Sequence, residues 1–505
     1  MYASDDSYDL VANAWIPVIG CDGAPRRAGL AEVVRRAGSL RAIAGPPPVR
    51  IALLRLIVAM LRDCLGPEAI APQRRRAWWE RECLPLEDFE AYLRTHAARL
   101  RLFDPRRPFL QDARLRGDRT PVKSVAELAP HLPTGNNATL TRRTTDLGGP
   151  NPVRFTAADA ACWLVSAHAH TRPGITGTRD GAPPGRISGR GGPLLGRLAV
   201  VPECGSLART LLLNLPGAAR DRLDLPAYRV ERPVRRAEEA RGPVSLLTWT
   251  TRHVLLVPEP DGTVTGVKIA ADPEVDPLVP RRTLAAHDPH LLAAAGREPS
   301  GVGGGWALEP AATERTALAD AAVIARHAAF PAPGSVIPTA AAAARVGHPV
   351  RLSVYGLAVE STSKFTGWTV SSLPCVDHGS AAAAARIARI AAEAAGEAAA
   401  QSTGERDRQG GPARRAMIRA RTSAAVWQSL DAQGRVLLGR IAAGATDPGE
   451  LARWRACCVR AARSALSESC HAVAQTSGAA KASARLEITL AATYGPAERE
   501  RAVRD

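Results

Sequence analysis

The chain has 505 residues, of which 46% are hydrophobic and 23% charged, which is the composition of a folded globular protein rather than a disordered one. A chain of this length exceeds the size of a single hydrophobic core, so we expect two or three domains. The formal net charge of +17 favours a polyanionic partner such as nucleic acid. Only four of the 66 basic residues are lysine, a ratio that codon bias in an arginine-rich proteome would explain.

Cysteine usage and the N-terminal residues indicate a cytoplasmic setting. None of the nine cysteines forms a C-x-x-C pair, which argues against a structural zinc site or a disulfide framework. The opening residues, MYASDDSYDLVANAW, are acidic and lack the apolar core of a signal peptide. No apolar run is long enough to span a bilayer, so we expect no membrane association. Because of the cysteine pattern, we also expect no bound metal.

The first third of the chain predicts helices joined by irregular segments. Residues 29–40 predict a short amphipathic helix, and residues 49–66 carry apolar side chains nearly all round, which is typical of a buried helix. Residues 86–103 predict a third helix. The proline-rich segment 103–112, FDPRRPFLQD, is expected to pack its two phenylalanines on the core, although its arginines could contact a ligand.

A helix beginning after Thr156 precedes an unusual loop. Thr156 has the features of an N-cap, with Asp159 three residues further on. His168 and His170 near the end of this helix are two residues apart and therefore point in different directions. A joint metal site is thus disfavoured, and we expect solvated or hydrogen-bonded histidines.

The loop that follows, residues 172–197, is rich in glycine and arginine. It contains eight glycines, four prolines, five arginines and a single acidic residue, Asp180. Glycine allows a backbone to lie close against another surface, and arginine carries a planar charged group suited to phosphates and base edges. A long loop of this composition is usually functional or disordered. We therefore expect this loop to contact nucleic acid.

Two β-hairpins are predicted in the middle of the chain. Residues 243–270 have strand character around an Asp-Gly pair at 261–262, which is a strong hairpin signal. Lys268 lies near the end of the second strand, where a solvated edge-strand lysine is the ordinary interpretation. Residues 349–370 predict a second hairpin with its tip near residues 360–363. Between the hairpins, the VGGGW sequence predicts a flexible or tightly turned loop.

The composition changes near residue 379 to that of a helical domain. Asp447, Pro448 and Glu450 predict a capped helix start, with proline at the first helical position. Short connections between four predicted helices favour an up-down bundle, over about 380–401, 413–430, 450–474 and 479–495. The sequence therefore predicts an α+β protein: a large, irregular mixed α/β domain with hairpins over residues 1–375, and an all-α four-helix bundle over 376–505.

Sequence motifs of catalysis are absent. The chain has no G-x-x-x-x-G-K-[ST], H-E-x-x-H or G-x-S-x-G motif, and its glycines do not form a dinucleotide fingerprint between a clear strand and helix. Neighbouring acidic residues such as Asp5-Asp6 are more typical of solvated charge than of general acid and base. A binding protein without a cofactor is favoured over an enzyme.

Several segments, taken in order, resemble the large subunit of the type I-E CRISPR surveillance complex, the CasA family of Cascade. These segments are LVANAWIPVI, FDPRRPFLQD, GNNATL, the glycine and arginine loop followed by LARTLLLNL, the hairpin LLTWTTRHVLLVP to TGVKIA, VYGLAVESTSK and the helical C-terminus. The resemblance covers essentially the whole chain. It implies a non-catalytic subunit with a mixed α/β domain and a C-terminal four-helix bundle.

The resemblance also implies partners. Such a subunit docks where the complex holds the 5′ handle of the CRISPR RNA, beside the backbone, handle-binding and small subunits. It recognises the protospacer-adjacent motif (PAM) in double-stranded target DNA, mainly from the minor groove, and helps to start strand separation and R-loop formation. It also presents a surface to the helicase–nuclease effector.

Site residues are carried over by position. The GNNATL segment matches the loop that contacts the RNA handle and a neighbouring subunit, through Gly135, Asn136, Asn137 and Thr139. The motif-binding set comprises Gly174, Gly177, Gly185, Arg186, Gly189, Arg190, Gly191, Gly192 and Lys268. The second hairpin matches a wedge inserted beside the first target base pair, with Glu360, Ser361, Thr362 and Lys364 at its tip. Relatives can carry glutamine at this tip, so the glutamate is a departure.

Two other interpretations remain open. A stand-alone basic DNA- or RNA-binding protein, with the bundle used for self-association, would bind nucleic acid without motif preference. A nuclease or hydrolase with a site scattered through the loops would need a metal-dependent acidic residue, and the sequence offers no candidate for that residue.

Overall fold

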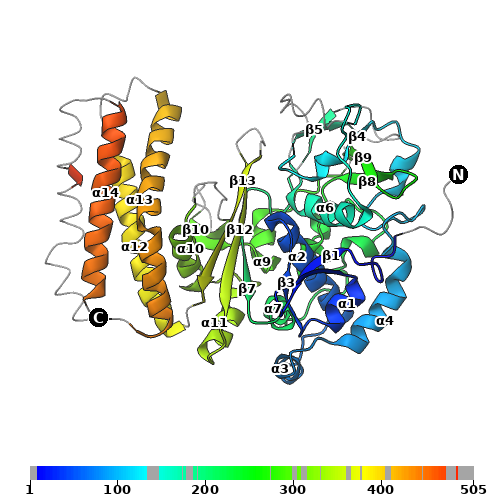
Figure 1. Ribbon diagram of the computed structural model, residues 1–505, viewed down its shortest axis with the longest axis horizontal. Helices are drawn as coiled ribbons and strands as arrows, with labels where there is room; N and C mark the ends of the chain where they lie inside the picture. Colours follow the sequence, from blue (N-terminus) through cyan, green and yellow to red (C-terminus); the bar gives the residue numbers. More distant parts are fainter. Residues whose placement is uncertain are drawn as a thin grey trace. The chain divides into compact units, whose positions relative to one another are not determined.

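In the computed structural model, the described residues are 8–132, 147–172, 174–177, 186–189, 191–272, 275–297, 304–308, 315–329, 331–359, 365–375, 378–403, 411–445, 447, 449–473 and 485–486. They belong to two compact units: one of Met1–Thr313, Pro331–Ala340 and Pro349–Val370, and another of Glu314–Phe330, Ala341–His348 and Ser371–Asp505. Helices and strands are mixed along the chain, as the α+β class predicts (Figure 1). Among the described helices, none has the length and apolarity to cross a membrane.

The core of the first unit is built around one buried helix, α2, Pro47–Cys64. Pro47 and Pro48 occupy the first helical turn, where a missing N–H costs nothing. Nearly every residue from Val49 to Asp63 is buried, which confirms the predicted buried helix. Further helices of this unit contribute to the same core: α1 Leu30–Arg35, α3 Pro72–Glu80, α4 Leu86–His96, α6 Ala157–His170, α7 Leu207–Asn214, α8 Pro243–Leu247 and α9 Arg281–His287.

Strands of this part of the chain form small antiparallel sheets. A three-stranded sheet has the order β2-β1-β3, another β4-β9-β8 and a third β13-β12-β7, while β5-β6 and β10-β11 are hairpins. Their bounds are β1 Ile16–Gly20, β2 Pro25–Ala28, β3 Leu40–Ile43, β4 Val122–Ser124, β5 Gly174–Gly177, β6 Arg186–Gly189, β7 Leu198–Glu203, β8 His253–Pro258, β9 Val264–Ala270, β10 Ala293–Arg297, β11 Gly304–Leu308, β12 Arg351–Val359 and β13 Phe365–Pro374.

Short 3-10 turns connect these elements: η1 Ala97–Arg99, η2 Ala113–Arg116, η3 Val125–Leu128, η4 Ala227–Arg229 and η5 Ala237–Glu239. Phe109 is 1% exposed and Phe103 is partly buried against the core, which confirms the expected packing of that irregular segment. Gly262 turns the β8–β9 hairpin with a positive φ of 79°, which confirms the Asp-Gly turn.

Two sequence predictions in this unit are wrong. Strand character was expected from residue 243, but residues 243–247 form α8, because Pro243 begins a helix and the buried carboxylate of Asp224 accepts hydrogen bonds from the N–H groups of Val244 (3.0 Å) and Ser245 (2.7 Å). The glycine-rich VGGGW segment was expected to be a loop. Its residues 304–306 belong to β11 instead, since β10 supplies an antiparallel partner, and its first two residues lie outside the described residues.

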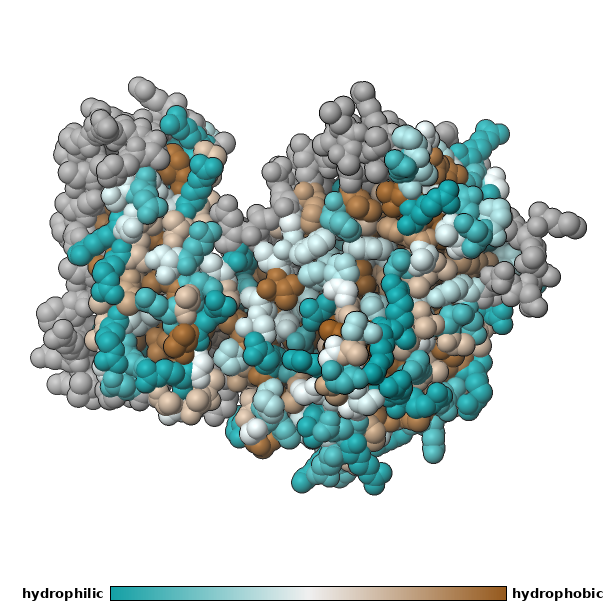
Figure 2. Space-filling model, in the orientation of Figure 1, coloured by the Kyte–Doolittle hydropathy of each residue, from teal (hydrophilic) through white to brown (hydrophobic). Residues whose placement is uncertain are grey.

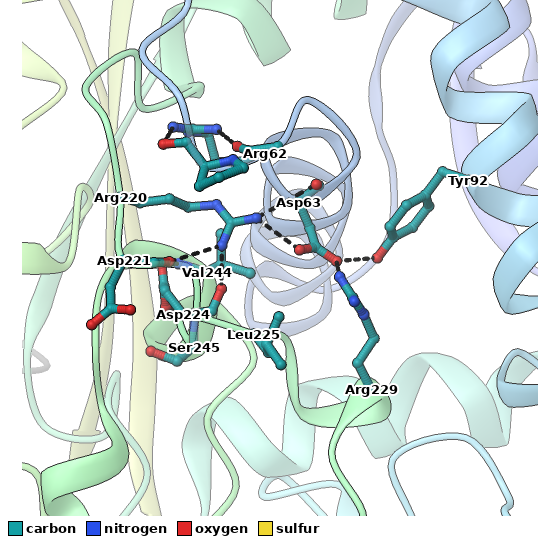
Figure 3. Close-up of polar contacts among 12 residues, drawn as sticks. Arg62, Asp63, Tyr92, Arg220, Asp221, Asp224, Leu225, Arg229, Val244 and Ser245 are labelled. Carbon is teal, nitrogen blue, oxygen red and sulfur yellow. Dashed lines mark hydrogen bonds and ion pairs between the residues drawn. The ribbon is translucent and has the colours of Figure 1, made fainter.

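A buried carboxylate at the end of α2 ties the surrounding segments together. Asp63 accepts hydrogen bonds from Arg220 (2.9 Å), Arg229 (2.7 Å) and the hydroxyl of Tyr92 (2.7 Å), which converge on it from three separate segments (Figure 3). Burial, with the nearby Tyr228 and Asp63, raises the pKa of Tyr92 well above its ordinary value, so this hydroxyl remains a donor. Because its donors satisfy the carboxylate, the cluster fixes loops to α2 rather than holding a reactive group.

A second buried ion pair involves Arg55 in the middle of α2. The guanidinium of Arg55 binds both carboxylate oxygens of Asp288 at 2.8 Å, and both side chains are almost fully buried. Burial would raise the pKa of Asp288, but the charge of Arg55 and its hydrogen bonds lower it below the ordinary value. The imidazole of His290 bonds the amide oxygen of Asn214 at 3.0 Å, which extends this network to α7.

Helices dominate the second unit. Its described long helices are α12 His378–Gln401, α13 Gly411–Ala442 and α14 Glu450–Val473, which pack side by side (Figure 1). A helix that the sequence did not predict, α10 Ala317–Ala329, packs on α12 and α13, and α11 Ile337–Arg345 follows it. The side chain of Asp447 accepts from the N–H of Gly449 at 3.0 Å, and the Asp447 N–H donates to the Glu450 carboxylate at 3.2 Å, which confirms the predicted cap of α14, while the predicted proline at the first helical position, Pro448, lies outside the described residues.

The four-helix bundle at the C-terminus stays a prediction. Its fourth helix, predicted near 479–495, lies outside the described residues except for residues 485–486. The predicted domain boundary at residue 376 also stays a prediction. The second unit recruits α10 from earlier in the chain, because Gly434 of α13 lets Leu318 approach closely: a Cβ at Gly434 would lie 2.6 Å from the Leu318 side chain.

Candidate nucleic-acid interface

Part of the glycine and arginine loop forms a short hairpin. Strands β5 and β6 pair antiparallel, with Gly174 opposite Gly189 and Gly177 opposite Arg186. The structure thereby brings together four residues of the predicted motif-binding set. Two others, Gly185 and Arg190, lie outside the described residues.

Gly177 at the end of β5 is exposed and has no neighbour that requires glycine. Among the residues that the structure describes, a Cβ built at this position meets no atom within 4 Å. The carbonyl of Gly177 accepts a hydrogen bond of 3.0 Å from the N–H of Ala271, directly after β9. This bond attaches the β5–β6 hairpin to the strand that carries Lys268. At Gly177 the backbone therefore lies exposed without a side chain, and an outside molecule could approach it closely.

Gly192 has an internal role instead. It is buried beside the end of α6, where an added Cβ would lie 2.5 Å from the carbonyl oxygen of Ala169. Its N–H donates to the carbonyl of Thr171 (2.8 Å), and the guanidinium of Arg197 reaches the carbonyls of Gly192 (3.3 Å) and Pro193 (2.7 Å). Close packing against α6 explains why residue 192 is a glycine. The preceding residue, Gly191, is half-buried.

Lys268 lies on β9, opposite Val122 of β4 and Leu255 of β8. Its ammonium donates to the carbonyl oxygens of Leu115 (2.9 Å) and Asp118 (2.6 Å), with the carbonyl of Arg116 at 3.5 Å. The side chain therefore binds the carbonyl end of η2, where a cation is electrostatically favoured. An ammonium has three N–H donors: two make short bonds to Leu115 and Asp118, and the third makes the long 3.5 Å bond to Arg116, which is the one most easily exchanged for an outside acceptor.

The other end of η2 is fixed by a buried aspartate. Asp112 accepts from the N–H of Arg114 (3.0 Å) and from its guanidinium (2.7 Å), and it lies 2.7 Å from Nδ1 of the buried His253. Burial would raise the pKa of Asp112, but the hydrogen bonds from His253 and Arg114 hold it well below its usual range. The turn that orients Lys268 is thus fixed at both ends.

Exposed arginines follow the segment that leads into this turn. The exposed arginines of this segment are Arg106, Arg107, Arg114 and Arg116. The guanidinium of Arg107 makes a long contact of 3.8 Å with the carboxylate of the exposed Glu231. Sequence reasoning mentioned the first two and missed Arg114 and Arg116, although the density of arginine between residues 101 and 119 was a usable signal. Exposed guanidinium groups of this kind suit phosphate contacts.

Two predicted contact segments lie outside the described residues. These are the GNNATL loop with Gly135, Asn136, Asn137 and Thr139, and the wedge tip with Glu360, Ser361, Thr362 and Lys364. The strands on either side of the tip, β12 and β13, are described and form neighbours in one sheet, as the predicted hairpin requires.

The two histidines of α6 are buried and hydrogen-bonded. His168 lies 2.8 Å from the carbonyl of Leu110, and His170 lies 3.0 Å from the carbonyl of Ser166. Burial lowers the pKa of each to about 4. Across the described part of the chain, no group of three or more His, Cys, Asp or Glu residues is placed to hold a metal ion.

The surface shown in Figure 2 is mixed in character. Apolar residues are scattered among hydrophilic ones on this face rather than gathered into one broad patch. The exposed large apolar residues of the described chain come from separate elements: Val122, Leu147, Leu223, Leu278, Val346, Val370, Met417 and Val436. Scattered exposure of this kind requires no docking partner to explain it.

Comparison with solved structures defines the class of the fold. The structure of Thermus thermophilus CasA (Cse1) is similar with a TM-score of 0.71 and 21% identity, over 96% of this chain and 98% of that one. A chain of a CRISPR RNA-guided surveillance complex is similar with a TM-score of 0.71 and 22% identity, over 96% and 99%. At these identities the likeness shows the fold alone, which is that of the Cse1 structures.

Sequence comparison then gives the family. Residues 9–465 match the family described as CRISPR-associated protein Cse1, and the chain belongs to that family. A curated relative from Thermus thermophilus, CRISPR-associated protein CasA/Cse1, is 33% identical over 268 residues, 51% of this chain. The match spans about half the length of that relative. The resemblance found in the sequence is thereby confirmed.

Proposed function

We propose that this protein is the large subunit of a type I-E CRISPR RNA-guided surveillance complex. It recognises the protospacer-adjacent motif in double-stranded DNA and starts separation of the target strands. In this role it binds the 5′ handle of the CRISPR RNA, contacts the other subunits and recruits the helicase–nuclease, and it acts in the cytoplasm without catalysing a reaction. Membership of the Cse1 family supports the proposal.

One observation carries the motif-reading part of the proposal. The N–H of Ala271 donates to the carbonyl of the exposed Gly177. Ala271 follows Lys268 by three residues in the chain, so this hydrogen bond ties Gly177 to the strand that carries Lys268. A backbone without side chains can approach the floor of the minor groove, and an ammonium group can donate to the acceptors that line it. Because the minor groove offers a degenerate code, we expect several related motifs to be tolerated.

Exposed arginines supply the affinity. Arg116 is the last residue of the turn that holds Lys268, whereas the guanidinium of Arg114 is paired with Asp112, so a phosphate contact of Arg116 would help to set the register of the duplex. Displacing counterions from DNA makes such binding weaken steeply with salt. Opening of the first base pair costs a few kcal/mol of stacking, which pairing with the guide RNA offsets.

Reconstitution tests the proposal. The remaining guide-RNA complex is mixed with a library of target duplexes with randomised flanking motifs, with and without this chain, and bound duplexes are sequenced. We expect enrichment of a small motif set only when the chain is present. Binding of nucleic acid by the chain alone without motif preference, with no effect on the complex, would instead support a stand-alone basic binding protein.

A further inference from the structure

Aromatic side chains gather beside the second hairpin. Phe365, the first residue of β13, lies directly after the predicted wedge tip in the sequence, and its ring centroid is 5.4 Å from that of Trp368. The imidazole of His131 meets Trp368 edge-on at 5.3 Å and an angle of 71°, and it meets Trp163 of α6 at 5.0 Å. These contacts form a continuous row of rings, which we name the aromatic row.

The aromatic row is rooted in the core and ends at the surface. Trp163 is 8% exposed, whereas Trp368 and Phe365 are half-buried and His131 is exposed. Trp368 also borders a small hollow lined by Pro47, Tyr355 and Leu357, among others, so its indole is not enclosed on every side. In a chain whose aromatic content is only 4%, a row of rings at the surface is a concentrated feature.

We propose that Trp368 and Phe365, with His131, form a stacking platform for an unpaired nucleobase released beside the second hairpin. The inference rests on the proposed function, because it requires that the hairpin open the duplex. Every base has a flat π-face, so stacking on indole and phenyl rings would stabilise an opened base without reading its identity. We therefore expect the platform to stabilise the opened state of the duplex and to leave the motif preference unchanged.

The character of the row favours a base over a protein segment. Partial desolvation of this surface ring lowers the pKa of His131, which favours an uncharged stacking surface at neutral pH. The net charge of +17 favours approach of a polyanion, whose phosphates can be held by arginine while its bases are free to stack. His131 also immediately precedes the segment that carries the predicted RNA-handle residues, so both flanks of the row lead into predicted nucleic-acid contacts.

The test measures opening of the first target pair in the reconstituted complex. Target duplexes carry 2-aminopurine at this pair in one strand or the other, and thymine oxidation by permanganate reports the opened fraction. In the wild type, 2-aminopurine should remain quenched at one of the two positions although the pair is open. Trp368→Leu should lower the opened fraction about fivefold or more, as loss of one stacking contact predicts, and the 2-aminopurine fluorescence per opened duplex should rise.

Controls separate this inference from its alternatives. Trp368→Phe keeps a stacking face and should retain most of the quenching, while Trp78→Leu, a half-buried tryptophan on α3, should behave as wild type. Motif preference should be the same in every variant. An open pair whose 2-aminopurine is equally bright in wild type and Trp368→Leu overturns the platform alone. Failure of the wild type to open any duplex overturns the proposed function and the platform together. Loss of complex assembly in both Trp368→Leu and Trp368→Phe would show a protein-docking surface instead.

Discussion

Arginine has two different roles in two regions of this molecule. Around α2, Arg55 and Arg220 are buried and each is paired with a buried carboxylate, Asp288 and Asp63. Around β9 and η2, the guanidinium of Arg116 is exposed and donates to the backbone carbonyl of Asp104 at 3.4 Å, next to the turn that holds Lys268. The +17 charge therefore has at least two components: Arg55 and Arg220 are matched by buried carboxylates and hold the fold, whereas an exposed guanidinium such as that of Arg116 can meet an outside anion.

The largest expected effect comes from breaking a buried pair. Asp288→Ala leaves the buried guanidinium of Arg55 without its partner and should lower the free energy of unfolding by about 3–5 kcal/mol. Chemical denaturation of the purified chain measures it. The matched control is Arg76→Ala, which removes an exposed pair with Glu80 and should leave the denaturation midpoint unchanged. Equal effects of the two substitutions would contradict the division between buried and exposed arginine.

The two glycines give the next contrast. Gly192→Ala places a methyl group against the carbonyl of Ala169 and should cost about 1–3 kcal/mol of stability, because a backbone carbonyl cannot move aside freely. Gly177→Ala introduces the same methyl group into open space and should leave stability unchanged. Thermal or chemical unfolding of both variants checks this difference, and a destabilised Gly177→Ala would show that this glycine is also required for folding.

Loss of the Lys268 ammonium should have a smaller effect on motif binding, and it also removes the hydrogen bonds from Lys268 to the η2 turn. Lys268→Met keeps the aliphatic stem and removes the ammonium, and we expect about tenfold weaker binding of the preferred duplex, as for one hydrogen bond to a charged group. Lys123→Met is the control, since Lys123 is adjacent to Val122 on β4 and points to the opposite face of the same sheet. Titration of fluorescent duplexes with the reconstituted complex measures both variants, and similar losses would argue for general electrostatics.

Acid should weaken the fold through its buried histidines. His168 and His170 have pKa values of about 4 in the folded chain, below the ordinary 6.5, so the unfolded chain takes up their protons first. The unfolding free energy should therefore fall as the pH drops from about 6.5 towards 4, by up to about 1.4 kcal/mol per pH unit for each histidine. His168→Gln should make this slope shallower, and an unchanged slope would contradict the assignment.

Single exposed arginines should have the smallest effects. Arg116→Gln should weaken binding equally for all duplex sequences and reduce the slope of log affinity against log salt by about 0.9, the value for one phosphate contact. Arg76→Gln, an exposed arginine on α3, serves as the control. A loss confined to one motif would show that Arg116 reads bases rather than phosphates.

Local signals in the sequence predicted many elements correctly. The all-round apolar pattern predicted α2, the Thr156 cap predicted the start of α6, and the Asp-Gly pair predicted the β8–β9 hairpin. In each case the deciding residues lie within one element, so tertiary contacts were not needed. The family could also be predicted from the sequence, because its motifs occur in the expected order along the chain.

Features that depend on distant residues were not predicted. The helix at α8 depends on Asp224, about twenty residues earlier, and β11 depends on pairing with β10. The sequence does not distinguish Gly177 from Gly192, since both are glycines of the same loop. The atoms around each one show that Gly177 is exposed, whereas Gly192 is packed against a carbonyl group. The ring contacts of His131 with Trp163 and Trp368 likewise join residues far apart in the chain.

The central claim is that the backbone edge at Gly177 approaches the motif. The most direct measurement is the motif preference of the reconstituted complex with Gly177→Leu, expressed as the ratio of affinities for the preferred and a scrambled motif. A side chain there should hold the backbone away from the groove floor, so we expect this ratio to fall towards one while the chain remains folded and assembled. An unchanged ratio would contradict the account and place motif reading elsewhere in the molecule.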